Sequence, residues 1–163
     1  IFIPAGTVHA IGAGLIVAEI QQSSDVTYRL HDWDRVGPDG RPRPLHVDAG
    51  IEAVTQFGPV APVQPTPTAD PAVRRLVTCD YFSFDEVRPA GSWEVGGDES
   101  CHFLAVISGE LRFEDHRNLP PLGRGECCLV PAVCGRQRLR VAAGPGDTPP
   151  TILRVGLSRA EPA

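Results

Sequence analysis

Residues 101–107 read Cys-His-Phe-Leu-Ala-Val-Ile, and Ser108-Gly109 separates them from Glu110-Leu111-Arg112-Phe113. A continuous apolar run, a glycine turn and a second short run are typical of two strands joined by a tight turn. Comparable short runs occur at residues 76–87, 125–131, 137–141 and 151–157. Short strands at this spacing predict an all-β sandwich or barrel for residues 76–163.

A proline-rich stretch precedes these strands. Residues 59–75 contain five prolines, which are Pro59, Pro62, Pro65, Pro67 and Pro71. Thr, Ala and Gln are found between them. Such a composition cannot form a packed core and favours an extended, polyproline-like chain. We therefore expect a linker or surface strap at 59–75, which divides the chain into segments 1–58 and 76–163.

The first segment predicts two strands and one helix. Residues 14–22 begin as an apolar run and end by alternating, and residues 26–30 read as the next strand. Residues 45–57 are the best helix candidate, because apolar side chains recur at helical spacing on one face. These are Val47, Ile51, Val54 and Phe57, although Gly50 disfavours a helix.

The beginning of the chain carries a candidate metal ligand. Residues 1–10 read Ile-Phe-Ile-Pro-Ala-Gly-Thr-Val-His-Ala, so His9 lies three residues beyond a Pro-x-Gly turn that follows an apolar strand. This arrangement aims one imidazole at a fixed point, as a metal site at the mouth of a β-barrel requires. Its partners must then precede residue 1, which makes the chain the later part of a longer enzyme.

A short sequence motif occurs in both segments. Ile3-Pro4-Ala5 recurs as Val130-Pro131-Ala132, each at the end of an apolar run. In the second copy Arg136 or a neighbour takes the position of His9, and no metal ligand is present. This is the pattern expected of a duplicated β-barrel with one active and one inert copy.

Composition excludes several classes of protein. The formal net charge is −5 and no basic block stands out, which argues against a nucleic-acid partner. No apolar run is long enough for a transmembrane helix, so no membrane partner is expected. The five cysteines form no C-x-x-C pair and their number is odd. They are interpreted as buried free thiols of a cytoplasmic protein rather than a disulfide framework or zinc knuckle.

Several motifs, in this order and spacing, resemble the type I mannose-6-phosphate isomerases in their short bacterial form, a family of the cupin superfamily. The first fifty residues carry the closest match, and the later segment resembles the C-terminal cupin domain of the family more loosely. The matching runs are residues 3–10, 17–22, 24–35 and 43–46, with looser anchors at Tyr81-Phe82, Gly97-Asp98-Glu99-Ser100 and Gly125-Glu126.

The resemblance implies a duplicated cupin, each barrel a double-stranded β-helix or jelly roll, with one zinc ion in the catalytic domain. Residues 1–58 would be the remainder of that domain and residues 76–163 a second, metal-free domain. The family interconverts mannose 6-phosphate and fructose 6-phosphate. Its zinc ligands are two histidines and a glutamate, joined by a glutamine in some members, and only the last histidine maps here, onto His9. The active-site arginine of the family maps onto Arg29.

Three polar residues of the first segment are candidates for the chemistry. An aldose–ketose isomerase moves a proton between C1 and C2, through an enediol that needs a base and a positive charge near its oxygens. Arg29 could bind the phosphate or stabilise the enediolate, or form a surface pair with Asp25 or Asp32. Glu19 could be a general acid or base, orient a ligand, or be solvated. Gln21 lies on the same strand face as Glu19 and could bind substrate.

The other histidines are expected to have structural roles. Packing or capping is predicted for His31, in a Trp/Asp-rich turn, and for His46, at the start of the helix. His102 lies on a buried strand without a second histidine two residues away, so it is interpreted as a core residue. His116 lies in a polar turn and is expected to be exposed.

The sequence therefore predicts part of a zinc-dependent, monomeric isomerase acting on a sugar phosphate, with the 163-residue chain inactive by itself. A non-catalytic sugar-binding or regulatory bicupin is the alternative. A cupin oxygenase is disfavoured because it needs iron and a His-x-His pair, which the sequence lacks.

Overall fold

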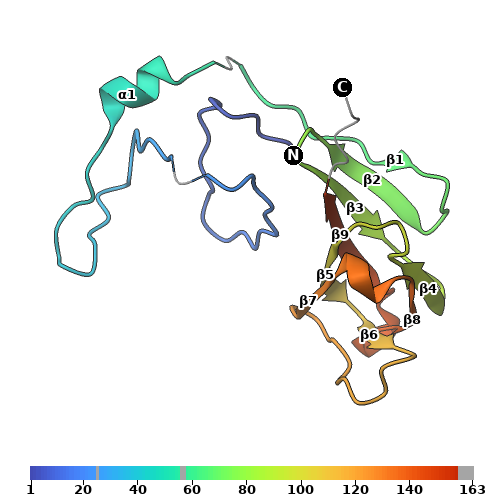
Figure 1. The fold of residues 1–163 in the computed structure, drawn as a ribbon. Coiled ribbons are helices and arrows are strands. Elements are labelled where there is room, and N and C mark those ends of the chain that lie inside the picture. Colours follow the sequence, from blue (N-terminus) through green and yellow to red (C-terminus); the bar gives the residue numbers. More distant parts are fainter. Residues whose placement is uncertain (25, 56–57, 158–163) are drawn as a thin grey trace. The chain divides into compact units, whose positions relative to one another are not determined.

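A computed structural model describes residues 1–24, 26–55 and 58–157 (Figure 1). The chain divides into two compact units, residues 1–62 and 63–163. Two residues used in the sequence argument, Asp25 and Phe57, lie outside the described residues.

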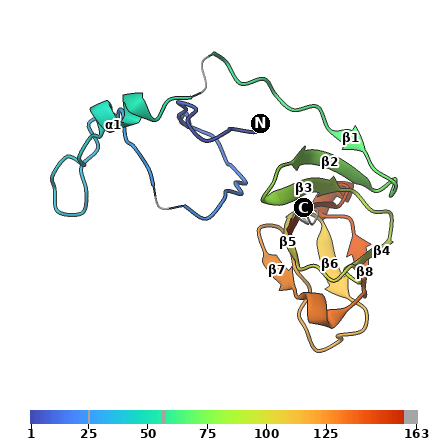
Figure 2. The ribbon, with the colours of Figure 1, turned by 45° about the horizontal axis from the view of Figure 1, so that its top comes forward.

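The second unit is built from two antiparallel sheets (Figures 1 and 2). The larger sheet has the strand order β1 (Thr66–Pro67), β2 (Val73–Thr78), β3 (Phe82–Val87), β9 (Thr151–Leu157), β5 (His102–Ser108) and β7 (Cys127–Val130). The smaller sheet has the order β4 (Ser92–Val95), β8 (Gln137–Ala142) and β6 (Glu110–Phe113). Two short 3-10 helices, η1 (Ala132–Cys134) and η2 (Pro145–Asp147), lie in the connections.

One apolar core joins the two sheets. The larger sheet contributes Val73, Val87, Leu104, Val106, Val130 and Ile152, and the smaller contributes Trp93, Val95, Leu111, Leu139 and Val141. Burial alternates along the strands, as in β8, where every second residue is buried. This is the period-2 pattern of strands with one face on a core, so packing between the sheets selects the register.

Most strands of the second unit were predictable from the sequence. The strand pair on either side of Ser108-Gly109 is confirmed, and β6 and β9 have the predicted bounds. The single predicted strand at residues 76–87 is wrong: Cys79, Asp80 and Tyr81 turn the chain, and β2 and β3 pair as a hairpin. Two strands were not predicted, β4 and the two-residue β1 within the proline-rich stretch.

The first unit differs more from expectation. Its described residues form helix α1 (Val47–Glu52), turns and irregular chain, and the predicted strands at 14–22 and 26–30 are absent from them. Helix α1 is shorter than predicted and ends at Glu52 with Ala53 as its C-cap, so Val54 lies outside it. A strand is stable only with partners for its backbone groups, and none of the described residues supplies one here.

Apolar side chains of the first unit remain exposed. Ile16 keeps 96% of its accessible surface, and Leu15, Val17 and Val26 are exposed by half or more. Burial of such side chains contributes about 1.5–3 kcal/mol each. The apolar run that suggested a strand is therefore not used to form a core within the described residues.

No helix in the described part of the chain combines the length and hydropathy needed to cross a membrane.

All five cysteines are described, and Cys101, Cys127, Cys128 and Cys134 are free thiols, as predicted. Their expected burial is wrong: Cys127 and Cys134 are exposed, and the other three are half-buried. Cys127 and Cys128 are consecutive on β7, so their side chains point to opposite faces of the sheet. Cys127 is exposed, and Cys128 packs against the core.

Burial, with a smaller contribution from Cys127, raises the pKa of the Cys128 thiol to about 11. Because the thiolate is the nucleophile, we expect iodoacetamide at pH 8 to alkylate Cys128 roughly 100-fold more slowly than an ordinary exposed cysteine. Peptide mass spectrometry over a time course measures this, with exposed Cys134 as the internal control. Equal rates at the two positions would contradict the burial of Cys128.

Candidate functional site

The turn before His9 is rigidly held. The Thr7 N–H donates to the Pro4 carbonyl at 3.2 Å, and Gly6 has a φ of +78°. The Thr55 N–H donates to the Gly6 carbonyl at 3.1 Å. A Cβ at Gly6 would lie 2.2 Å from Thr55 Oγ1, so both the backbone conformation and the close approach require glycine.

His9 is exposed, and one of its ring nitrogens is oriented by the backbone. Its Nδ1 lies 2.8 Å from the Thr7 carbonyl oxygen, which can accept only from a protonated Nδ1. Metal-binding histidines commonly make such a hydrogen bond, which leaves Nε2 for the metal. This hydrogen bond is compatible with the predicted role of His9 as a metal ligand, which stays a prediction.

The remaining ligands of a zinc site are missing from the described residues. Among them, no group of three or more His, Cys, Asp or Glu side chains is arranged to hold a metal ion. A catalytic zinc usually takes three protein ligands. The described residues thus do not form a zinc site by themselves.

Arg29 is fixed by contacts with its own unit. Its side chain is one-quarter exposed, its Nε lies 3.9 Å from Asp32 Oδ1, and its Nη1 donates to the Pro44 carbonyl at 3.3 Å. Its backbone N–H donates to His46 Nδ1 at 3.2 Å. The pairing with Asp32, which was one of the alternatives for Arg29, is present in the structure.

Asp32 anchors this region. Its carboxylate is buried and accepts two hydrogen bonds from Arg43, one of them from Nε at 2.7 Å. The Arg43 guanidinium holds the pKa of Asp32 below its ordinary value. Asp32 therefore stays ionised near neutral pH and can orient Arg29 without being neutralised.

Glu19 and Gln21 are exposed. Their assignments as general acid or base and as substrate ligand stay predictions.

The other histidines have the structural surroundings that were expected. His31 packs edge-on against Trp33, with ring centroids 5.0 Å apart. His46 is the N-terminal cap residue of α1, without a side-chain capping bond. His116 is exposed, and its Nε2 lies 2.9 Å from Gln137 Oε1.

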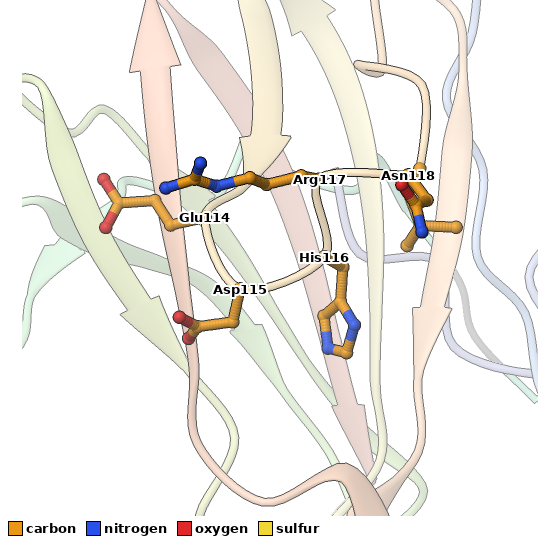
Figure 3. A pocket seen from close by; sticks show the side chains of 6 residues that line it. Glu114, Asp115, His116, Arg117 and Asn118 are labelled. Carbon is orange, nitrogen blue, oxygen red and sulfur yellow. The ribbon is translucent and has the colours of Figure 1, made fainter.

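A hollow of about 590 Å³ lies on the loop between β6 and β7 (Figure 3). It is lined by residues 114–119, so a single loop supplies every side chain. Glu114 is engaged by Arg140 at 3.8 Å. Because no second element contributes a functional group, this hollow is a surface turn rather than a candidate site.

The interior of the second unit contains a buried charge cluster that the sequence analysis missed. Asp85 on β3 is completely buried, with Arg75 of β2 and Arg154 of β9 beside it. Arg75 Nε donates to Asp85 Oδ1, and Arg154 donates to Oδ2 from Nε at 3.0 Å and from Nη2 at 2.6 Å. These three residues are cross-strand neighbours in the sheet.

Next to this cluster lies a pocket of about 190 Å³, which we call the barrel-end pocket. Its polar lining comprises Arg75, Ser83, Asp98, Ser100, His102 and Arg154, with Gly156 and Leu157 completing the wall. His102 is buried, as predicted, and its Nε2 lies 2.9 Å from Asp98 Oδ1. Burial raises the pKa of Asp98, but hydrogen bonding and charge from His102 outweigh this, and the net pKa is lowered.

Comparisons with known proteins connect this fold to one enzyme family. No protein-family model matches the chain. The chain is 34% identical over 142 residues to the mannose-6-phosphate isomerase ManA of Bacillus subtilis. The matched region covers 85% of this chain and 44% of ManA. The mannose-6-phosphate isomerase of Streptococcus mutans is 31% identical over 132 residues, covering 80% of this chain and 42% of that protein.

Solved structures agree. The crystal structure of the Bacillus subtilis mannose 6-phosphate isomerase is similar with a TM-score of 0.62 and 27% identity, over 81% of this chain and 40% of that one. The Salmonella typhimurium enzyme, crystallised with its substrate and zinc, has a TM-score of 0.53 at 19% identity, over 72% and 29% of the two chains. The latter likeness concerns the fold alone.

The chain thus spans less than half the length of the curated relatives that it matches. These findings confirm the resemblance drawn from the sequence motifs: the chain is homologous to the C-terminal portion of the type I mannose-6-phosphate isomerases.

Proposed function

We propose that this chain is the C-terminal portion of a mannose-6-phosphate isomerase, which interconverts mannose 6-phosphate and fructose 6-phosphate. The observation that carries the proposal is the 34% identity over 142 residues to an enzyme of that name. The oriented imidazole of His9 and the fixed cation of Arg29 are its structural support.

The first unit would complete a catalytic barrel together with protein outside these 163 residues. Its exposed apolar side chains, such as Ile16 and Leu15, are suited to packing against such a partner segment. The second unit would be the metal-free half of a duplicated cupin. In this proposal the protein is a cytoplasmic monomer.

Within that enzyme, His9 would be one zinc ligand, and zinc would supply Lewis-acid polarisation of the sugar oxygens. The described residues do not complete this site, so no step is assigned to the metal. Arg29 would bind the phosphate, or it would stabilise the negative charge on the enediolate oxygens as a proton moves between C1 and C2. Glu19 would transfer or relay that proton, and Gln21 would bind the sugar.

A chimera tests the proposal. Residues 1–163 replace the matching C-terminal part of Bacillus subtilis ManA, and conversion of mannose 6-phosphate to fructose 6-phosphate is measured by a coupled assay. We expect turnover by the chimera, and none by the 163-residue chain alone, because one histidine cannot form the usual three-ligand zinc site.

The control is the ManA part without this chain. A chimera that is soluble, folded by circular dichroism and zinc-loaded, but inactive, would contradict the proposal. Binding of sugar phosphate by that chimera without turnover would favour the alternative, a non-catalytic sugar-binding bicupin.

A further inference from the structure

The barrel-end pocket is assembled by strand register. Ser83 on β3 pairs with Gly156 on β9, and Gly156 pairs with His102 on β5, so the three form one row across the sheet. Asp85 and Arg154 occupy the adjacent row, two residues further along the same strands. Residues two apart on a strand share a face, so both rows point to the same side.

This face changes from apolar to polar along the strands. Val87 pairs with Ile152, and both are fully buried in the core. The next row on that face carries the Asp85–Arg154 ion pair, and the row after it lines the pocket. Polar groups are therefore concentrated where the core opens into the pocket.

One buried polar atom at this site has no partner. The His102 side chain is 8% exposed, and its Nδ1 makes no hydrogen bond within the described structure. In the neutral tautomer that donates from Nε2 to the Asp98 carboxylate, Nδ1 is an acceptor. An unsatisfied buried acceptor is unfavourable, so the site favours a ligand that donates a hydrogen bond to it.

The space in front of Nδ1 is kept open by glycine. A Cβ at Gly156 would lie 3.7 Å from His102 Nδ1 and 3.1 Å from Ser83 Oγ. The imidazole nitrogen and the hydroxyl thus border the same small volume. Ser83 Oγ makes no hydrogen bond in the portion of the chain that the structure describes.

The charges around the pocket cancel when His102 is neutral. Two cations, Arg75 and Arg154, are matched by two carboxylates, Asp85 and Asp98, and Asp85 binds both arginines. With His102 in this neutral form, an oxyanion would meet no net positive charge, whereas hydroxyl groups can accept from guanidinium and serine donors and donate to His102 Nδ1. The pocket volume equals that of about six water molecules at ~30 Å³ each, which limits the ligand to a small molecule.

We propose that the barrel-end pocket binds a neutral polyhydroxylated molecule of monosaccharide size, which donates one hydroxyl hydrogen bond to His102 Nδ1. This inference does not depend on the proposed isomerase activity, since every residue involved lies in the second unit.

Titration of the ¹⁵N-labelled 163-residue chain with D-mannose, followed by amide chemical shifts, tests the proposal. We expect saturable shifts around Ser83, His102 and Gly156 with a Kd in the millimolar range. Gly156→Ala adds a methyl group between His102 and Ser83 and should weaken binding at least tenfold. Gly156 has no positive φ, so this substitution introduces no backbone strain. Gly123→Ala is the matched control, because a Cβ there has only Glu126 Oε2 nearby, at 3.6 Å, and should leave binding unchanged.

Ser83→Ala is a second test that adds no atoms and should also weaken binding. Absence of saturable shifts up to about 100 mM D-mannose, or equal affinity of the Gly156→Ala and Gly123→Ala proteins, would overturn the proposal. Tighter binding of inorganic phosphate than of D-mannose at these residues would overturn it too, because the charge argument would then be wrong.

Discussion

Replacing Asp85 by alanine is expected to destabilise the second unit by about 3 kcal/mol. Asp85 is fully buried and accepts hydrogen bonds from both Arg75 and Arg154. Removing it leaves two cations at the core without their partner, a change that typically costs about 3–5 kcal/mol. The lower value is expected because the arginine side chains are 34% and 21% exposed and can be partly rehydrated.

Urea unfolding measures this loss through the fluorescence of Trp93, which is 5% exposed, in a Trp33→Phe background. Arg154 lies over the Trp93 ring at 5.7 Å, so the probe reports on the same part of the core. The control is Glu94→Ala, which removes exposed pairs with Arg136 and Arg138 and should change stability by no more than about 0.5 kcal/mol. A loss below about 1 kcal/mol for Asp85→Ala would show that Asp85 does not hold the sheet together.

The local sequence pattern was sufficient to predict most strands of the second unit. The apolar run at 101–107 and the glycine turn after it specify β5 and β6 without reference to the rest of the chain. Strand β4 was missed although it alternates, with Trp93 and Val95 buried and their neighbours exposed. Its four residues lie between glycines, so the alternation is too short to distinguish a strand from a turn.

The same reasoning failed for the first unit. Residues 14–22 have the apolar content of a strand, but a strand exists only where another backbone pairs with it. The described residues provide no such pairing, so the run stays irregular. Helix α1 depended less on partners, because its hydrogen bonds are internal, and its existence was predicted though not its length.

The barrel-end pocket could not be found from sequence spacing. Ser83, His102 and Gly156 are widely separated along the chain, and only the antiparallel register of three strands makes them neighbours. One signal was nevertheless present in the sequence. Asp85 shares a strand face with the apolar Val87, and an acidic residue at such an inward position requires a buried cationic partner.

The proposed enzyme depends most directly on Arg29, and Arg29→Ala in the active chimera is expected to lower turnover by about 100-fold or more. Removal of a preorganised donor to a developing oxyanion usually has an effect of this size. If Arg29 stabilises the enediolate, kcat and kcat/KM should fall together. If it binds only the phosphate of the substrate, the loss should be found mainly in KM.

Two features make this variant informative. Asp32 keeps its two hydrogen bonds from Arg43 when Arg29 is removed, so the local structure should survive. Arg35→Ala is a matched control, because Arg35 is an exposed neighbouring arginine that stacks 5.6 Å from the Trp33 ring centroid. It should leave kcat and KM close to those of the unmodified chimera.

Zinc content separates the role of Arg29 from that of His9. Arg29 is a cation and not a ligand, so Arg29→Ala should retain stoichiometric zinc while losing activity. His9→Ala should lose most of the metal and nearly all activity, because it removes one of the few ligands of a catalytic site. Full zinc in the His9→Ala chimera would remove His9 from the metal site. Near-normal kinetics of Arg29→Ala would leave Arg29 only its structural pairing with Asp32, and the proposed mechanism would then lack its cation.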